Sequence, residues 1–305
     1  MNIVFMGTPD FAVASLDALI NAGHTIVGVV TAPDKPAGRG QKLGESAVKK
    51  YAMQKQLPIL QPSKLKDPTF LAELKALKAD LQIVVAFRML PEVVWNMPPK
   101  GTINLHASLL PQYRGAAPIN WAIINGEKES GVTTFLLQQE IDTGNILLAQ
   151  RIAIPPTYTA GDLHDKLMEV GSKLLVDTVN AVEVNQITAK PQSDLIATEL
   201  LKHAPKIFKE DCKIEWNRPV EQVYNHIKGL SPYPTAFTFF QDKTLKLFRV
   251  ELDKTSPEVV PGSVVTDHKM ELKFACQDGF IIVKELQLEG KKRLLIEDFL
   301  RGTRL

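Results

Sequence analysis

The chain has 305 residues, of which 45% are hydrophobic and 23% are charged, the composition of an ordinary soluble globular protein. This length favours two domains over a single core. The 36 basic and 34 acidic residues give a formal net charge of +2, which excludes any argument for nucleic-acid binding from overall charge. An RNA partner would have to bind through local basic patches.

The cysteine content and the hydropathy pattern indicate an intracellular protein. Cys212 and Cys276 match neither a metal-ligand spacing nor a disulfide framework, so a reducing compartment and packing roles are expected for both. The N-terminus lacks a basic segment followed by a long apolar one, and no apolar run approaches the roughly eighteen residues of a membrane-spanning helix. We expect a cytoplasmic protein without a membrane partner, acting as a monomer.

Four short runs rich in β-branched or aromatic residues, each bounded by Gly, Pro, Asp or Asn, are typical of buried strands. They lie at residues 2–6, 24–30, 81–87 and 103–106. Between the first two, helical spacing of apolar residues predicts a helix over residues 11–21, with Asp10 as its N-cap and Gly23 beyond its end. Further helices are predicted over residues 46–56, 69–78 and 162–183. This alternation predicts an α/β fold with a doubly wound, mainly parallel sheet in a domain of residues 1–189.

The turn after the first strand, residues 7–10, occupies the place of a dinucleotide-binding loop. Its sequence Gly-Thr-Pro-Asp lacks the Gly-x-Gly-x-x-Gly pattern, whose glycines admit a pyrophosphate. A nicotinamide or flavin site is therefore not expected.

The C-terminal third has a different pattern. Residues 190–205 lose any period and contain several Pro, Ser and Thr residues, which predicts a linker. One helix is predicted over residues 220–228, followed by several short alternating stretches with turn residues between them. These stretches lie at residues 236–240, 244–250, 262–265, 271–275 and 279–285. Such a series predicts a small β-barrel domain over residues 206–305.

The most informative motif is Asn-x-His on the fourth strand. Asn104 and His106 lie two residues apart, so both side chains point to one face, near the carboxyl end of the strand where open α/β sheets bind ligands. An amide and an imidazole together can stabilise an oxyanion and move a proton, as acyl transfer to an amine requires. Asp142, in an Asp-Thr-Gly turn, is a candidate third member. Taken alone, Asn-x-His is more often a structural pair, and Asp142 more often initiates a turn.

The run SLLPQYRGAAP at residues 108–118 resembles the signature of the 10-formyltetrahydrofolate-dependent formyltransferases. The resemblance covers nearly the whole chain, and includes FMGTPDF at residues 5–11, the Asn-x-His motif, the Asp-Thr-Gly turn and HAPKI at residues 203–207. The GTPDF start, the RGAAPI run and the extra C-terminal domain are closest to the family members that formylate methionyl-tRNA. This relationship implies that the C-terminal barrel is OB-like and binds tRNA.

The resemblance also implies a reaction without a metal or nucleotide cofactor. The amine of initiator methionyl-tRNA attacks the formyl carbon on N10 of 10-formyltetrahydrofolate. Asn104 and His106 would bind the oxyanion of the tetrahedral intermediate. A nearby carboxylate favours the cationic form of an imidazole, so Asp142 would support His106 and accept the amine's proton, directly or through water.

The folate is expected along residues 87–91 and 108–111, because a pterin needs an apolar slot edged by backbone donors and acceptors. The candidate residues are Arg88, Met89, Leu90, Ser108, Leu109, Leu110 and Pro111. The alternative is that the apolar side chains among them belong to the core. A pocket position is the preferred interpretation for Leu109 and Leu110, while Met89 fits either.

Two basic segments are candidates for tRNA contact. The loop at residues 31–43 resembles the inserted loop with which the family grips the acceptor end, and Lys35, Arg39 and Lys42 can pair with phosphates. In the C-terminal domain the best local patch comprises Lys291, Lys292 and Arg293, with Arg301 and Arg304 nearby. Solvated, non-binding segments are the alternative for both.

Two other functions remain open at this stage. A formyltransferase acting on a small sugar-nucleotide or ribonucleotide amine would have the same catalytic residues, but would not need the basic loop or the second domain. A non-catalytic RNA-binding protein would retain only an inert folate-like cleft. The intact set of Asn104, His106 and Asp142 argues against this last alternative.

Overall fold

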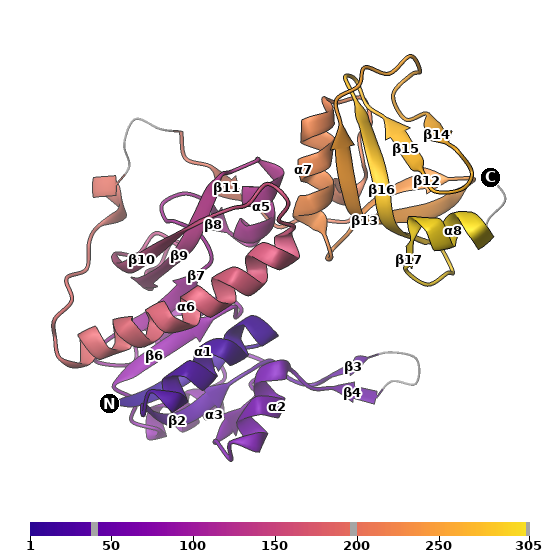
Figure 1. The fold of residues 1–305 in the computed structure, drawn as a ribbon. Helices are drawn as coiled ribbons and strands as arrows, with labels where there is room; N and C mark the ends of the chain where they lie inside the picture. Colours follow the sequence, from indigo (N-terminus) through magenta and orange to yellow (C-terminus); the bar gives the residue numbers. More distant parts are fainter. Residues whose placement is uncertain (38–41, 196–199, 303–305) are drawn as a thin grey trace. The chain divides into compact units, whose positions relative to one another are not determined.

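A computed structural model describes residues 1–37, 42–195 and 200–302, which form two compact units (Figure 1). The first unit comprises Met1–Gly115, Gly131–Ile152 and His164–His203. The second comprises Ala116–Ser130, Ala153–Leu163 and Ala204–Leu305, and so includes two segments from the N-terminal half of the chain. The division into a domain of residues 1–189, a linker and a domain of residues 206–305 stays a prediction.

The first unit is built on a seven-stranded sheet. Its strands are β1 (Asn2–Gly7), β2 (Thr25–Val30), β5 (Ile59–Leu60), β6 (Leu81–Val85), β7 (Thr102–His106), β9 (Glu129–Leu136) and β10 (Ile146–Ala153). The strand order is β10-β9-β7-β6-β1-β2-β5. The pairs from β5 to β7 are parallel, whereas β9 runs antiparallel to β7. The prediction of a mainly parallel sheet is confirmed.

Helices cover both faces of this sheet, so the doubly wound architecture is also confirmed. On one face, α3 (Pro68–Ala76) and α4 (Glu92–Trp95) pack against alternate residues of β1, such as Val4. On the other face, α1 (Asp10–Asn21) and α6 (Ala160–Glu183) lie side by side (Figure 1), and the rings of Phe11 and His164 meet edge-on with centroids 5.2 Å apart. Next to α1 lies α2 (Ala47–Gln54).

The ends of two helices test the capping predictions. Asp10 lies in the first turn of α1 and Pro9 takes the cap position, so the predicted cap role of Asp10 is wrong; its carboxylate lies instead near the positive end of the helix dipole. Gly23 follows the helix with a left-handed backbone (φ +86°), as predicted. Ser46 caps α2, since its Oγ accepts a hydrogen bond from Lys49 N at 3.0 Å.

The second unit contains the predicted antiparallel strands. They are β12 (Ala236–Phe240), β13 (Lys243–Asp253), β14 (Val264–Thr266), β15 (Leu272–Ala275), β16 (Phe280–Leu288) and the short β17 (Leu294–Leu295). The order is β12-β13-β16-β15-β14, with β17 paired to β16. Register shifts between β13 and β16 bend the sheet. Within the described residues β12 and β14 do not pair with each other, so this OB-like domain is a curled half-barrel.

Three helices complete the second unit. The inner side of the sheet is covered by α7 (Val220–Leu230), as predicted, and the chain ends in α8 (Ile296–Gly302). Against α7 packs α5 (Pro118–Ile124), from the N-terminal half of the chain. Their contact depends on Gly229, since a Cβ there would lie 2.4 Å from Cγ1 of Ile124. Among the residues that the structure describes, no helix is both long and apolar enough to span a membrane.

Lys228 of α7 is an unusual buried cation. Its side chain is 8% exposed, and its Nζ donates to the Pro156 carbonyl at 2.6 Å and lies 4.4 Å from the centre of the Tyr224 ring. Burial lowers the pKa of Lys228 to about 8; repulsion from Lys128 adds to this effect and attraction to Glu221 opposes it.

We expect Lys228 to make stability depend on pH. Below about pH 8, Lys228 is protonated in both the native and the unfolded state, and burying its charge destabilises the native state. Between about pH 8 and 10.5, Lys228 is protonated only in the unfolded chain. Stability of the wild type relative to Lys228→Met should therefore rise across this window, by about 3 kcal/mol. Urea unfolding of both proteins at several pH values measures this difference. The exposed Lys246→Met serves as the control, and parallel profiles for wild type and Lys228→Met would contradict the prediction.

Candidate active site

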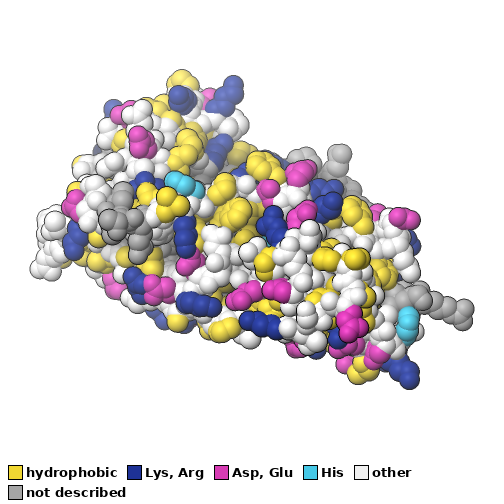
Figure 2. All heavy atoms as spheres, turned by 90° about the horizontal axis from the view of Figure 1, so that it is seen from above, with side chains coloured by type: hydrophobic (Ala, Val, Ile, Leu, Met, Phe, Trp, Pro, Cys, Tyr) yellow, Lys and Arg dark blue, Asp and Glu magenta, His cyan; other side chains and the backbone are white. Residues whose placement is uncertain are grey.

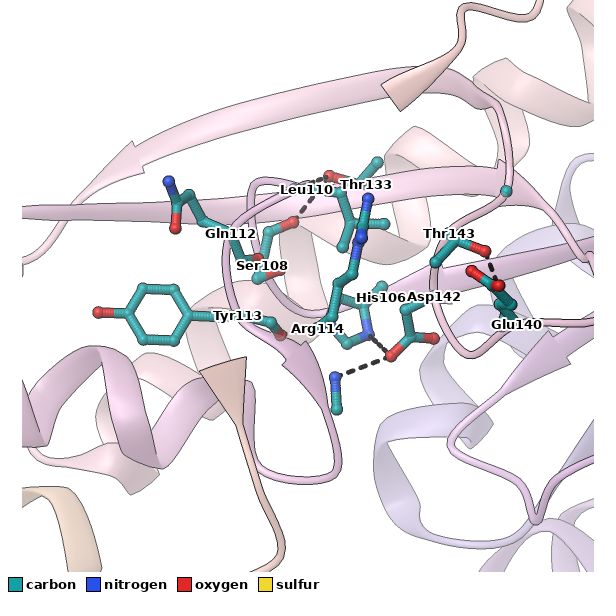
Figure 3. Close-up of polar contacts among 12 residues, drawn as sticks. His106, Ser108, Leu110, Gln112, Tyr113, Arg114, Thr133, Glu140, Asp142 and Thr143 are labelled. Carbon is teal, nitrogen blue, oxygen red and sulfur yellow. Dashed lines mark hydrogen bonds and ion pairs between the residues drawn. The ribbon is translucent and has the colours of Figure 1, made fainter. Parts of the chain in front are cut away.

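His106 is the last residue of β7, where it lies opposite Thr133 of β9 and is 7% exposed. Its Nε2 lies 2.9 Å from the carbonyl oxygen of Tyr113, and because a carbonyl only accepts, this nitrogen carries a hydrogen. Its Nδ1 lies 3.8 Å from Oδ2 of Asp142, and Figure 3 shows the ring and the carboxylate pointing toward one another. Both ring nitrogens thus face acceptor oxygens.

Asp142 enters the site from the turn between β9 and β10. Its backbone is left-handed (φ +54°) and its side chain is almost fully buried. The oxygen that faces His106 also accepts a hydrogen bond from the backbone N–H of Gly115 at 2.9 Å. In the same turn, Thr143 Oγ1 donates to the Glu140 carbonyl at 3.1 Å (Figure 3). The Asp142 carboxylate therefore reaches out of its own turn, which a purely turn-forming aspartate would not do.

Asn104 lies two residues before His106 on β7, between Val84 of β6 and Phe135 of β9. Strand alternation places its side chain on the same face as His106. It is partly exposed, and within the described part of the chain its amide has no hydrogen-bond partner. Asn104 therefore supplies a free donor beside the His106–Asp142 pair.

The segment after β7 is fixed by hydrogen bonds to its own backbone and to β9. Ser108 Oγ donates to the Gln112 carbonyl at 2.7 Å, and Thr133 Oγ1 donates to the Ser108 carbonyl at 2.7 Å. Leu110 N donates to the same Thr133 oxygen at 3.2 Å. These contacts (Figure 3) order the segment between β7 and Tyr113, and so position the Tyr113 carbonyl beside His106.

The residues predicted to line the folate site differ in their exposure to solvent. Leu110 is packed in a core cluster with Phe135 and Ile146, and Ser108 and Pro111 are buried as well. Leu109 is partly exposed. From the second predicted segment, Leu90 lies in the core between α3, α4 and the sheet, and Met89 is 71% exposed, which excludes a core role for Met89.

Arg88, the remaining predicted folate residue, is held by backbone carbonyls. Its guanidinium donates to the carbonyls of Ser63, at 3.0 Å, and Pro62. Those two residues line a hollow of about 220 Å³, together with parts of β5 and α3. Arg88 is thus bound beside this hollow, and its hydrogen bonds within the described residues go to these carbonyls and not to His106 or Asp142.

The residues proposed for tRNA contact are only partly described. Lys35 is exposed on β3 (Lys35–Ala37), which pairs antiparallel with β4 (Lys42–Gly44). Arg39 lies outside the described residues, and only the backbone of Lys42 is described. This hairpin is the observed form of the basic loop.

The C-terminal basic patch carries less free charge than its sequence suggests. Lys291 and Lys292 are exposed, but the Arg293 guanidinium makes a two-pronged ion pair with Glu285, at 2.6 and 2.5 Å, and stacks over Phe248. On the face drawn in Figure 2, Lys and Arg side chains are interspersed with Asp and Glu. Arg304 lies outside the described residues.

Other chemistry is sparse in the described ranges, 1–37, 42–195 and 200–302. They contain no group of three or more His, Cys, Asp or Glu side chains that could hold a metal. Cys212 and Cys276 are both buried and free, and burial raises the pKa of each thiol. Two contributors to the site carried no signal in the sequence: the Tyr113 carbonyl and the Gly115 amide.

Comparisons with known proteins bear on this geometry. A profile of the formyl transferase family matches residues 1–179, and one for the formyl transferase C-terminal domain matches residues 206–304. The chain is 54% identical over 310 residues to a methionyl-tRNA formyltransferase of Bacteroides fragilis, covering 100% of this chain and 96% of that protein. It is 51% identical over 306 residues to a methionyl-tRNA formyltransferase of Flavobacterium johnsoniae, covering 99% of this chain and 96% of that protein.

Solved structures show the same fold at low sequence identity. An N-formyltransferase from Helicobacter canadensis, in complex with folinic acid and dTDP-3-aminofucose, matches with a TM-score of 0.69 at 20% identity, over 92% of this chain and 98% of that one. HypX from Aquifex aeolicus in complex with tetrahydrofolic acid matches with a TM-score of 0.67 at 18% identity, over 98% of this chain and 46% of that one. The chain thus spans about half the length of HypX.

Proposed function

The chain belongs to the formyl transferase family, and from that premise we propose that it transfers the formyl group of 10-formyltetrahydrofolate to the amino group of initiator methionyl-tRNA. The observation that carries the choice of acceptor is the 54% identity, over 100% of the chain, to a protein named for that reaction. The tetrahydrofolic acid bound to HypX, a protein of the same fold, supports a folate donor.

The site geometry fits the chemistry of this reaction. The amine nitrogen forms a bond to the formyl carbon, the carbonyl oxygen becomes an oxyanion, and the bond from carbon to N10 breaks as N10 takes up a proton. The free amide of Asn104 donates to the oxyanion. Nδ1 of His106 lies 3.8 Å from Asp142 Oδ2, which is longer than a hydrogen bond, so this edge of the ring is open to the same oxygen. Asp142 accepts the proton that the amine loses, directly or through water.

We also propose that the protein acts as a monomer. Methionyl-tRNA is used in translation, so we also propose a cytoplasmic location. We propose that the folate binds beside the segment that follows His106. Of the residues predicted for it, Leu109 is partly exposed and Met89 is exposed, so these two are the most accessible apolar side chains.

A formyl-transfer assay tests the proposal. The purified chain receives labelled 10-formyltetrahydrofolate with one acceptor at a time: initiator methionyl-tRNA, the same tRNA without methionine, a dTDP-linked amino sugar, or an amino ribonucleotide. Label should appear on methionyl-tRNA alone. Transfer only to a small amine would establish the alternative acceptor class, and tRNA binding without any transfer would favour a non-catalytic RNA-binding protein.

Arg39→Ala is expected to weaken methionyl-tRNA binding and to leave folate affinity unchanged. One lost phosphate contact should reduce the slope of log affinity against log salt concentration by about one unit, whatever the tRNA sequence. Binding measured at a series of salt concentrations gives this slope. Lys55→Ala, at an exposed position beyond α2, provides the matched loss of one charge. A slope equal to that of the wild type would remove Arg39 from the interface.

A further inference from the structure

The side-chain amide of Gln192, next to the candidate site, has all its hydrogen-bond donors and acceptors occupied. It lies in the 3-10 turn η1 (Gln192–Leu195) and is 3% exposed. Its Nε2 donates to the carbonyls of Asp142 and Gly144, at 2.8 Å each. Its Oε1 accepts from Arg114, at 3.0 Å from Nε and 2.6 Å from Nη2. Both hydrogens and both lone pairs of the amide are therefore occupied.

These partners permit only one orientation of the Gln192 amide. In the reverse orientation the NH₂ group would face the guanidinium, which only donates, and the oxygen would face two carbonyls, which only accept. The backbone just before Gln192 is also fixed, because Lys190 and Ile146 exchange hydrogen bonds at 2.8 Å. Gln192 thus forms an ordered bridge between Arg114 and the Asp142 turn. It lies in a segment that the sequence predicts to be a linker.

The two ends of this bridge hold the two partners of His106. At one end are the carbonyls of Asp142 itself and of Gly144, in a turn pressed so closely on β9 that a Cβ on Gly144 would lie 1.7 Å from the Leu136 oxygen. At the other end is Arg114, which lies between the Tyr113 carbonyl, bound to His106, and the Gly115 amide, bound to Asp142 Oδ2.

We propose that Gln192 is a positioning residue, which sets the Asp142 carboxylate at its place beside His106 without touching substrate. Without the bridge, the left-handed Asp142 turn and the segment that carries Tyr113 and Gly115 are no longer tied to each other. The distance from carboxylate to imidazole then varies. A displacement of about 1 Å at a reacting group is enough to lower turnover by about 100-fold. The effect on turnover rests on the proposed function, whereas the effect on Asp142 does not.

Two substitutions of similar volume separate donation from packing. Gln192→Met removes all four hydrogen bonds. Gln192→Glu retains the oxygen that accepts both hydrogen bonds from Arg114, but it turns its other carboxylate oxygen toward the two carbonyls. We expect kcat to fall about 10- to 100-fold in both, with the larger loss in Gln192→Glu, and KM for the folate to change less than about twofold. As a control, Gln139→Glu places a charge at an exposed position in the loop between β9 and β10, which carries Asp142. Its kcat should match that of the wild type.

A double-mutant cycle tests whether Gln192 acts through Asp142. In an Asp142→Ala background, Gln192→Met should cause little further loss of kcat, because the group that it positions is already gone. If the fold losses of kcat from the two substitutions multiplied in the double mutant, or if Gln192→Met changed only KM, Gln192 would support the structure in general and the proposal would be overturned. Thermal unfolding of each variant identifies any loss that follows from misfolding; if Gln192→Met does not fold, Gln192→Glu, which retains the pairing with Arg114, takes its place in the cycle.

Hydrogen exchange tests the inference without any substrate. The Gly115 amide hydrogen is held by Asp142 Oδ2, so its exchange in Gln192→Met should be about tenfold faster than in the wild type, while core amides such as that of Phe5 keep their rates. Unchanged exchange at Gly115 overturns the positioning role. Faster exchange in a protein that transfers no formyl group would retain it and reject the proposed function.

Discussion

Asp142→Asn is expected to lower kcat/KM for formyl transfer by about 10³- to 10⁴-fold while the fold is retained. The asparagine has nearly the same shape, and its side-chain oxygen can still accept the hydrogen bond from Gly115 N–H. What is lost is the negative charge 3.8 Å from His106 Nδ1, on the carboxylate that we propose takes the amine's proton. The change therefore acts on the transition state and not on packing.

Steady-state kinetics with methionyl-tRNA and 10-formyltetrahydrofolate measure this loss, and equilibrium binding of each substrate should stay within about threefold of the wild type. Asp194→Asn, at an exposed position in η1, is the matched control and should be fully active. If Asp142→Asn kept a tenth or more of the activity, the carboxylate would have no role in proton transfer.

The central residues of the site could be predicted because they follow a local rule. A period of two places Asn104 and His106 on one face of a strand, and the run of β-branched residues around them predicts the strand itself. The approach of Asp142 depends on a turn between two strands that the sequence pattern did not reveal. Buried threonines in β9, such as Thr134, bonded to Thr178 at 2.8 Å, interrupt the apolar run by which a buried strand is identified.

The supporting contacts could not be predicted, for two physical reasons. The Tyr113 carbonyl and the Gly115 amide are backbone groups. Every residue offers a carbonyl and every residue type other than proline offers an N–H, so neither leaves a mark in the sequence. Gln192 lies in an aperiodic, proline-containing segment, and its burial follows from the path of the chain around Asp142. A polar residue in such a segment is normally exposed to solvent, so its burial is not expected from the sequence.

The ligand-binding predictions show what residue type alone leaves open. A pterin slot and a protein core both need apolar side chains, so the sequence does not distinguish them: a pocket position is the preferred interpretation for Leu110, whereas the structure packs Leu110 and Leu90 in core clusters. Counting charges also could not reveal that Arg293 is paired, because strand pairing between β16 and β17 places Glu285 against it. Three-dimensional pairing thus decides which cations remain free to attract a phosphate.

Asn104→Ala is expected to lower kcat by about 10²- to 10³-fold, with little change in KM. Its amide has no partner in the described part of the protein, whereas Nε2 of His106 is already bonded to the Tyr113 carbonyl. A donor that is unoccupied before the reaction and bound to an oxyanion during it stabilises the transition state selectively, so its removal appears in kcat.

Asn104→Asp separates this donor role from packing. The aspartate has the same shape, but it places a negative charge where the oxyanion forms, so its loss of activity should exceed that of Asn104→Ala although it leaves no cavity. Asn96→Ala, on an exposed residue just after α4, controls for the loss of an amide elsewhere. If Asn104→Asp were the more active of the two, packing at this position would matter more than donation, and His106 alone would have to stabilise the oxyanion.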